Sequence, residues 1–269
     1  MRTYPDGVMH KDGEQSFIVM QDALRRTRPI LMERAGKVKH IDKQDGSPVT
    51  ETDIKIERMI QAELRAAFPR LPVFGEEGGY KEGLSGTFWL VDPIDGTKSF
   101  IQNVPTFTNM AALIRDGETI ASIIYNPSTN DMYTAQKGRG AYKNGVRLDL
   151  GAVPLPPMAI CKELFISRLN DILGTTDVLC ERAPTGAGFG FTLVADGLAA
   201  ARFNLLSNGY THDYAPGALL ISEAGGVIVS VLDDTYTYES RSFVACHPAL
   251  ERVLQSHVVE LRKLEVMGR

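Results

Sequence analysis

The stretch that decides the fold is Trp89-Leu90-Val91-Asp92-Pro93-Ile94-Asp95-Gly96-Thr97. An apolar strand, expected over residues 87–91, leads directly into two aspartates, and a Gly-Thr pair follows the second of them. Carboxylates at the end of a buried strand are costly unless positive charge compensates them. Their oxygens suit Mg²⁺ or Mn²⁺, and backbone N–H groups exposed after Gly96 suit a phosphate. The stretch therefore indicates a phosphoryl-transfer site, with a plain Asp-Gly turn as the simpler alternative.

Three other acidic segments point the same way. Gly75-Glu76-Glu77-Gly78-Gly79 forms a glycine-rich loop after a short apolar run at residues 71–74. Thr50-Glu51-Thr52-Asp53 and His212-Asp213 each stand where a helix is expected to begin. Taken singly, a solvated loop explains the first segment and helix capping explains the other two. Taken with Asp92 and Asp95, they predict one shared acidic site.

The rest of the chain predicts a first half of helices and antiparallel strands, and a second half in which strands and helices alternate. Two amphipathic helices are expected, one over residues 15–34 and one that starts at Thr50 or Thr52 and ends at Phe68. Their inner faces are expected to carry Phe17, Met20, Leu24 and Leu31 in the first helix, and Ile56, Ile60, Leu64 and Ala67 in the second.

Strands over residues 108–114 and 119–125 are expected to pair around an Asp116-Gly117 turn. Further strands are expected at residues 132–135, 141–143, 158–161, 199–203, 227–231 and 243–245, and helices at 163–173, 189–195, 212–223 and from 248 onward. The segment Pro154-Leu155-Pro156-Pro157 is the expected seam. We therefore expect one domain, residues 1–269, with an α+β half over about 15–153 and an α/β half over about 158–262.

Composition excludes several classes of protein. The formal net charge is −4, so a surface that binds nucleic acids generally is not expected. No apolar run approaches the roughly 20 residues of a membrane span, and the polar N-terminal segment does not resemble a signal peptide. The three cysteines, Cys161, Cys180 and Cys246, are widely spaced, which favours buried free thiols in a reducing, cytoplasmic setting.

Taken in order, the acidic segments resemble the inositol monophosphatase family. The family pattern is a Gly-Glu-Glu loop, then Asp-Pro-Ile-Asp-Gly-Thr, then a distant aspartate at a helix start that ends in Glu-Ala-Gly-Gly. The matching residues are Gly75-Glu76-Glu77, Asp92 to Thr97, and Asp213 with Ala215, Gly217 and Glu223-Ala224-Gly225-Gly226. The segment from Asp45 to Asp53 and the run from Tyr125 to Tyr142 are also similar to the family, so the resemblance covers roughly residues 16–250.

The resemblance implies a layered αβαβα sandwich of the sugar-phosphatase type and a Mg²⁺-dependent phosphoric monoester hydrolase, with Li⁺ as an inhibitor. Mn²⁺ is expected as a substitute, because it also takes oxygen ligands. The resemblance also implies that metals are held by Glu76, Asp92, Asp95, Asp213 and the backbone carbonyl of Ile94. Glu76 and Thr97 would position an attacking water that metal activates, and Asp53 would contact a metal-bound water. Asp95, Gly96, Thr97 and Asp213 would bind the substrate, with the Gly96 and Thr97 N–H groups on its phosphate. A homodimer is also implied.

Two departures from the family bear on the substrate. His212 stands where the family often has tryptophan, and we interpret it as a structural spacer. Inositol-specific members usually have a glutamate seven residues before the aspartate, where this chain has Leu206, followed by Ser207 and Asn208. Hydrolysis of inositol 1-phosphate is the first expectation for this small-metabolite phosphatase.

Other readings stay open. Histidinol-phosphate phosphatase and 3′(2′),5′-bisphosphate nucleotidase are alternatives on the same fold. A regulatory binding protein on that fold is an alternative from another class. A haloacid-dehalogenase-type phosphatase is disfavoured, because its motif spaces the aspartates by two, whereas Asp92 and Asp95 are three apart.

Overall fold

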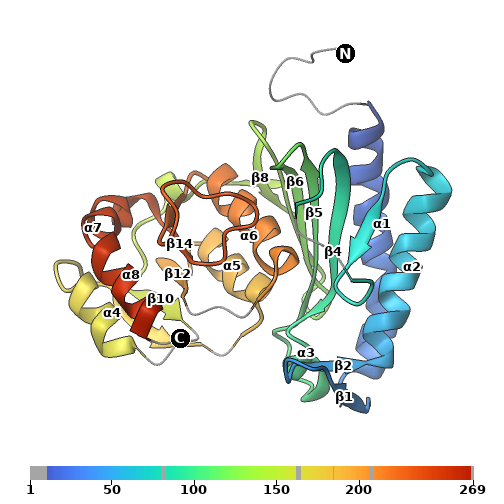
Figure 1. Ribbon diagram of the computed structural model, residues 1–269, viewed down its shortest axis with the longest axis horizontal. Coiled ribbons are helices and arrows are strands. Elements are labelled where there is room, and N and C mark those ends of the chain that lie inside the picture. The colour runs from blue at the N-terminus through green and yellow to red at the C-terminus, as the bar shows by residue number, and fades with distance from the viewer. Residues whose placement is uncertain (1–10, 80–82, 162–164, 184, 206–208, 268–269) are drawn as a thin grey trace.

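The computed structural model describes residues 11–79, 83–161, 165–183, 185–205 and 209–267. Its layers follow the order helices, sheet, helices, sheet, helices (Figure 1). This is the expected αβαβα sandwich, and helices pack on both faces of each sheet because both faces are apolar. Among the described residues, no helix is both long and apolar enough to cross a lipid bilayer.

The first layer consists of two helices, α1 (Lys11–Arg34) and α2 (Glu51–Ala67). Both expected helices are confirmed, and α1 begins four residues earlier than residue 15. Thr50 caps α2 through a capping box in which Asp53 accepts a hydrogen bond from the Thr50 backbone N–H. The predicted inner residues of both helices are buried except Ala67, which is exposed because it ends its helix. In the chain segment that connects these two helices, β1 (His40–Asp42) and β2 (Pro48–Thr50) form a two-stranded hairpin.

The larger sheet has seven strands in the order β3-β4-β5-β6-β7-β8-β9. The first pair is parallel and all others are antiparallel. Asp116 and Gly117 both have positive φ, at 50° and 86°, which confirms the expected hairpin turn. The strands are β3 (Val73–Gly75), β4 (Thr87–Asp95), β5 (Thr108–Arg115), β6 (Glu118–Asn126), β7 (Asp131–Gln136), β8 (Gly140–Lys143) and β9 (Val146–Leu148), with the short helix α3 (Thr97–Ile101) after β4.

The smaller sheet has five strands in the order β11-β10-β12-β14-β13, with parallel and antiparallel pairs. Helices α5 and α6 lie between the two sheets, while α4, α7 and α8 cover the outer face (Figure 1). The strands are β10 (Met158–Cys161), β11 (Leu179–Arg182), β12 (Ala201–Asn204), β13 (Val227–Ser230) and β14 (Phe243–Cys246). The helices are α4 (Ile166–Leu173), α5 (Ala187–Ala195), α6 (Thr211–Glu223), α7 (Glu251–Ser256) and α8 (Val258–Met267), and the 3₁₀ turns are η1 (Leu150–Ala152) and η2 (Pro248–Leu250).

Three large apolar cores fill the spaces between the layers, and a smaller one joins Phe88 and Leu90 of β4 to Ala215 of α6. One lies between the α1–α2 layer and the large sheet and contains Trp89 and Phe100. The second lies around α5 and α6 and contains Phe191 and Phe243, and the third lies under α4, α7 and α8. Burial on both faces explains why β5 and β6 read as nearly continuous apolar runs in the sequence.

The three cysteines are buried thiols outside any disulfide bond, as expected, at 0–2% exposure. Burial raises the pKa of the Cys246 thiol to about 12, so this group is protonated at neutral pH. We expect a disulfide reagent such as DTNB to leave all three thiols unmodified in the native protein at pH 8, and to modify all three in guanidinium chloride. Rapid modification of the native protein would show that these cores open locally.

Candidate active site

Two acidic side chains come from the end of β4. On a regular strand, residues three apart face opposite sides of the sheet. Here the pairing of β4 with β5 is irregular between Asp92 and Asp95, and the side-chain amide of Asn109 donates a hydrogen bond to the Pro93 carbonyl. Asp92 in turn accepts a hydrogen bond from the Ile94 N–H at 3.0 Å. The local irregularity therefore allows both carboxylates to reach the same site.

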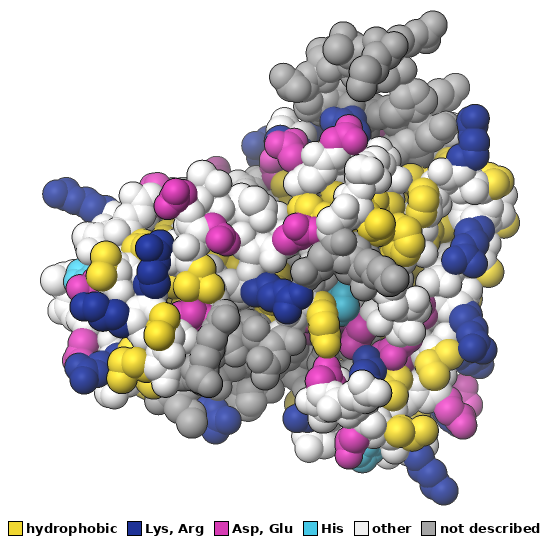
Figure 2. Space-filling view, viewed as in Figure 1, with side chains coloured by type: hydrophobic (Ala, Val, Ile, Leu, Met, Phe, Trp, Pro, Cys, Tyr) yellow, Lys and Arg dark blue, Asp and Glu magenta, His cyan; other side chains and the backbone are white. Residues whose placement is uncertain are grey.

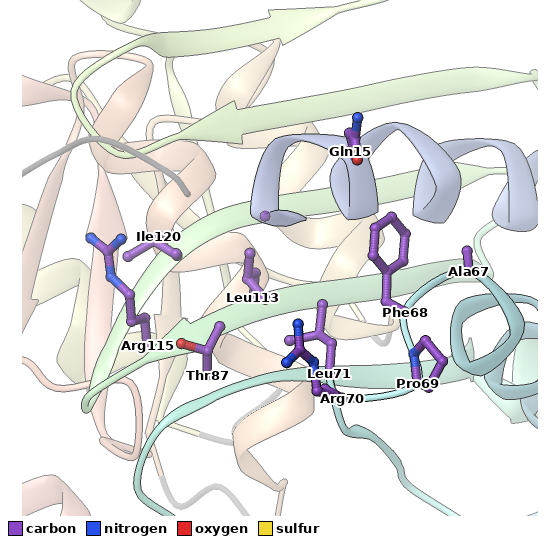
Figure 3. Close-up of a pocket in the computed structure, with 11 residues that line it drawn as sticks. Gln15, Ala67, Phe68, Pro69, Arg70, Leu71, Thr87, Leu113, Arg115 and Ile120 are labelled. Atoms are coloured by element: carbon purple, nitrogen blue, oxygen red, sulfur yellow. The ribbon is translucent and has the colours of Figure 1, made fainter. Parts of the chain in front are cut away.

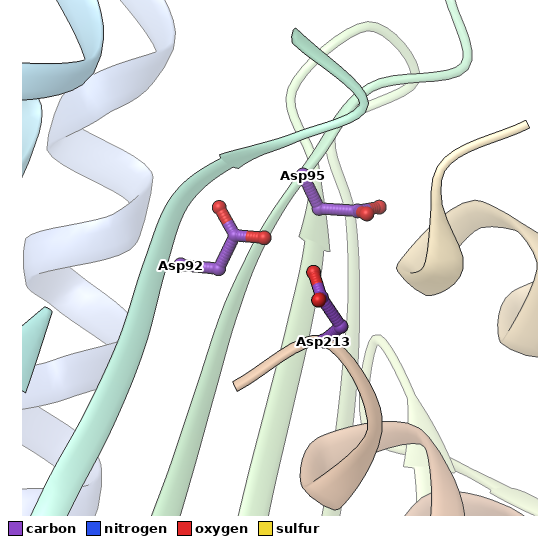
Figure 4. A group of neighbouring side chains, drawn as sticks. All are labelled: Asp92, Asp95 and Asp213. Carbon is purple, nitrogen blue, oxygen red and sulfur yellow. The ribbon is translucent and has the colours of Figure 1, made fainter. Parts of the chain in front are cut away.

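The third carboxylate comes from the start of α6, 118 residues beyond Asp95 in the chain. One oxygen each from Asp92, Asp95 and Asp213 lie within 4.8 Å of one another, and Figure 4 shows the three carboxylates converging. Asp213 also caps α6 by accepting a hydrogen bond from the Tyr210 N–H. Asp213 therefore does both: it caps α6, as the simpler explanation says, and it belongs to the acidic cluster.

The Asp95 carboxylate accepts hydrogen bonds from the first turn of α5, a helix that the sequence motif did not indicate as part of the site. The backbone N–H groups of Ala187 and Gly188 donate to its two carboxylate oxygens at 2.7 and 2.8 Å, and the Thr108 hydroxyl donates at 2.9 Å. These N–H groups belong to the first turn of α5, where donors have no partner within the helix and a negative charge is favoured. A Cβ on Gly186 would lie 2.4 Å from the Asp95 carboxylate, so a glycine is needed there.

Glu76 lies beside this cluster, because β3 pairs with β4. Gly75 stands opposite Val91, and the Glu76 N–H donates to the Val91 carbonyl at 3.1 Å. Its carboxylate is paired with the Lys43 ammonium at 2.6 Å, and Lys43 also bonds Glu77 at 2.6 Å. Lys43 is a residue that the sequence reasoning missed. Its only signal was a basic side chain in the polar loop before Asp53.

Asp53, Ile94 and Thr97 meet on the α2 side of the site. The Thr97 hydroxyl lies 3.1 Å from the Ile94 carbonyl and 3.4 Å from an Asp53 oxygen. Gly96 precedes α3 in the left-handed region, at φ 83°, a conformation that glycine adopts without strain. The structure therefore brings every residue of the predicted site into one region.

Burial and neighbouring carboxylates raise the pKa of two groups of the site, Asp92 and Asp53. Burial, together with the charges of Glu76, Asp95, Asp213 and Asp53, holds the pKa of Asp92 well above its ordinary value. Burial also raises the pKa of Asp53 to about 6, although hydrogen bonds from Thr50 oppose this. Buried carboxylates this close together stay ionised only where cations offset their charge, and an all-oxygen donor set suits Mg²⁺. The residues present therefore fit a magnesium site.

His212 and Tyr210 stand at the edge of the site. The His212 side chain is buried, its Nε2 lies 4.0 Å from a Glu76 oxygen, and its ring stacks on that of Tyr210 with centroids 5.5 Å apart. Arg241 lies over the Tyr210 ring. Figure 2 shows basic, acidic and histidine side chains close together near the middle of the visible face. Leu206, Ser207 and Asn208, which bear on inositol specificity, lie outside the described residues.

A separate cavity of about 520 Å³ lies between the start of α1, the turn after α2 and the strands β4, β5 and β6. Figure 3 shows apolar and basic side chains intermixed among the lining residues, including Phe68, Leu71, Leu113, Arg70 and Arg115. None of the predicted site residues lines this cavity, so it is distinct from the acidic cluster.

Comparison with known proteins identifies the family. Residues 13–264 match the model of the inositol monophosphatase family. An inositol-1-monophosphatase of Rhizobium meliloti is 32% identical over 229 residues, which cover 77% of this chain and 82% of the relative. A 3′(2′),5′-bisphosphate nucleotidase of Aggregatibacter actinomycetemcomitans is 30% identical, over 75% of this chain and 79% of the relative.

Solved structures agree. The extragenic suppressor protein suhB of Bartonella henselae superimposes with a TM-score of 0.78 at 25% identity, over 93% of this chain and 99% of that chain. Family match, fold and the convergence of the acidic motif residues lead to the same conclusion. The chain belongs to the inositol monophosphatase family, and it is a metal-dependent phosphoric monoester hydrolase.

Proposed function

We propose that this enzyme hydrolyses the phosphate monoester of a small metabolite with Mg²⁺, and that inositol 1-phosphate is its first candidate substrate. The observation that carries the proposal is the buried cluster of Asp92, Asp95 and Asp213, whose oxygens lie within 4.8 Å of one another. Such a cluster is costly to fold unless a cation joins it. The family membership supplies the reaction class.

Glu76, Asp92, Asp95, Asp213 and the Ile94 carbonyl are the groups that would hold the metal. Bound Mg²⁺ would make hydroxide available near neutral pH and would offset the negative charge of the phosphate. The hydrogen bonds from Ala187 and Gly188 fix the orientation of the Asp95 carboxylate before any ligand arrives. Glu76 must leave its ion pair with Lys43, at least in part, in order to act as a ligand.

The remaining roles belong to polar groups around α3. We assign Thr97 and Glu76 to the orientation of the attacking water. The Thr97 hydroxyl is already fixed between the Ile94 carbonyl and Asp53. Asp53 would orient a second water, and the Gly96 and Thr97 N–H groups would donate to the phosphate, with Asp95 and Asp213 beside the substrate. Because these groups are already held in place, less entropy is lost when the water and the phosphate are brought into reacting geometry.

A second substrate class is favoured by one observation. The bisphosphate nucleotidase relative is nearly as similar to this chain as the inositol-1-monophosphatase, at 30% against 32% identity. Histidinol phosphate is a further candidate from the sequence. Homodimer formation and Li⁺ inhibition stay predictions of the family resemblance. Use of Mn²⁺ stays a prediction from the oxygen donors, and a cytoplasmic location stays a prediction from the cysteines.

Phosphate release tests the proposal. The substrates are inositol 1-phosphate, histidinol phosphate, 3′-phosphoadenosine 5′-phosphate and fructose 1,6-bisphosphate, each with Mg²⁺, with Mn²⁺, with Mg²⁺ plus Li⁺ and with a chelator. We expect turnover only with metal, and the highest kcat/KM for inositol 1-phosphate. A higher kcat/KM for the adenosine bisphosphate would replace the first substrate by the second. The absence of turnover on all four would contradict the proposal and favour a regulatory binding role.

A further inference from the structure

Glu57 is a buried carboxylate that the chemistry above does not use. It lies on α2, one turn after Asp53, and only 4% of it is exposed. Among the residues that the structure describes, the hydrogen-bond donors to Glu57 are neutral. The Glu77 backbone N–H donates to it at 2.8 Å, the Gly78 N–H also donates, and the Gln61 amide donates at 3.1 Å. A buried charge without a cation is costly, so its retention calls for a specific reason.

Two glycines of the Gly75–Gly79 loop, Gly75 and Gly78, leave room for this carboxylate. A Cβ on Gly75 would lie 2.1 Å from the Glu57 carboxyl carbon, and a Cβ on Gly78 would lie 2.8 Å from one of its oxygens. Neither glycine has a positive φ, so backbone conformation does not require glycine at these positions. What requires it is the space that the Glu57 carboxylate occupies.

Glu76 is therefore held from both sides through the backbone. Its own N–H is bonded to the Val91 carbonyl of β4 at 3.1 Å, and the next N–H, of Glu77, is bonded to Glu57 of α2. With both flanking peptide groups fixed, the Glu76 side chain can leave the loop in only a narrow range of directions. This range points toward the site, where its carboxylate meets Lys43 and lies 4.0 Å from His212 Nε2.

We infer that Glu57 is a positioning residue for the metal site: its carboxylate clamps the backbone of the Gly75–Gly79 loop and thereby aims Glu76 at the metal. The inference rests on the proposed function, in which Glu76 is a metal ligand. Glu57 itself touches neither substrate nor metal. Groups that orient metal ligands in this way typically change metal affinity by about 10- to 100-fold when they are removed.

The first experiment separates metal affinity from chemistry. Mg²⁺ binding to the metal-free protein is measured by calorimetry for wild type, Glu57→Gln and Glu57→Ala, with kcat at saturating Mg²⁺ alongside. We expect Glu57→Ala to weaken Mg²⁺ binding by about 10-fold or more, and Glu57→Gln to weaken it less, with kcat within a few-fold of wild type. Glu63→Gln is the matched control, because Glu63 lies on the same helix, is paired with Arg26, and should leave Mg²⁺ binding unchanged.

A double-variant cycle tests geometry against simple loss of charge. Gly75→Ala keeps the Glu57 charge, but its new methyl group would displace the carboxylate. We expect Gly75→Ala alone to weaken Mg²⁺ binding, and to add little in the Glu57→Ala background, where the space is free. Additive effects, or unchanged Mg²⁺ binding in folded Glu57→Ala, would overturn the inference.

The outcome also distinguishes failure of the inference from failure of the proposed function. If Glu76→Gln weakens Mg²⁺ binding while Glu57→Ala does not, the metal site stands and the clamp is wrong. If the wild-type protein binds no Mg²⁺ in the calorimeter, both are wrong. Unfolding of the metal-free variants is monitored by circular dichroism, and Glu57→Gln decides the case if Glu57→Ala does not fold.

Discussion

Asp92→Asn is expected to lower kcat by on the order of 10³-fold and to leave the fold intact. Asn is nearly isosteric with Asp and keeps an oxygen that can accept the hydrogen bond from the Ile94 N–H, which spans 3.0 Å in the native protein. What the variant loses is a negative charge at the centre of the cluster with Asp95 and Asp213. Loss of that charge removes a ligand for the metal on which the reaction depends.

Stability distinguishes this outcome from general damage. In the metal-free wild type, burial and neighbouring carboxylates raise the pKa of Asp92, which means that its ionised form is destabilised there. Removing the charge relieves that repulsion, so metal-free Asp92→Asn should melt at the same temperature as wild type or higher. Mg²⁺ should raise the Tm of wild type, because a ligand that binds only the folded state stabilises it.

The measurement is thermal unfolding of both proteins with a chelator and with Mg²⁺, beside the activity assay. A variant that melts far below wild type in the chelator would show that Asp92 supports the fold. A variant with near-normal activity would remove the metal-site proposal altogether. The Mg²⁺-dependent rise in Tm should be much smaller in the variant than in wild type.

Local patterns in the sequence predicted much of the fold. Apolar periodicity predicted both helices of the first layer, and the Asp116-Gly117 pair predicted the β5–β6 hairpin. These features are decided within a few residues, by side-chain spacing and by backbone conformations that few residues adopt. Ala67 was placed wrongly, because periodicity continues to the last residue of a helix whereas packing against the core stops earlier.

The proximity of the acidic residues was predictable from the sequence, but the hydrogen bonds that hold them were not. Asp92, Asp95 and Asp213 do converge, and Glu76 lies near Asp92, as the ordered acidic segments predicted. By contrast, the hydrogen bonds from Ala187 to Asp95 and from Glu77 to Glu57 join residues 92 and 20 positions apart. No local periodicity encodes such pairs. The sequence signal for both was small residues, Gly186 and Gly75, whose reason appears only when the carboxylates beside them are known.

Gly217→Ala is expected to destabilise the fold strongly, although it adds only one methyl group. A Cβ at this position of α6 would lie 1.9 Å from the Phe191 ring of α5. Phe191 is fully buried, its ring stacks on that of Phe243 with centroids 6.2 Å apart, and Arg202 lies over it at 5.2 Å. The ring has no free space to enter, so α5 and α6 must separate.

Overpacking of this kind costs about 1–3 kcal/mol or more, and it outweighs the gain of up to about 1 kcal/mol from the better helix propensity of alanine. Since α6 carries Asp213 and α5 donates to Asp95, separation of the helices should also weaken Mg²⁺ binding.

Chemical denaturation measures the change in the free energy of unfolding, and Gly151→Ala is the control, because its Cβ would meet only an exposed Asp149 oxygen at 3.3 Å. Phe191→Leu should destabilise the wild type but restore part of the stability of Gly217→Ala. Wild-type stability in Gly217→Ala would show that the two helices adjust at no cost, and that the close approach of α5 and α6 does not set the geometry of the site.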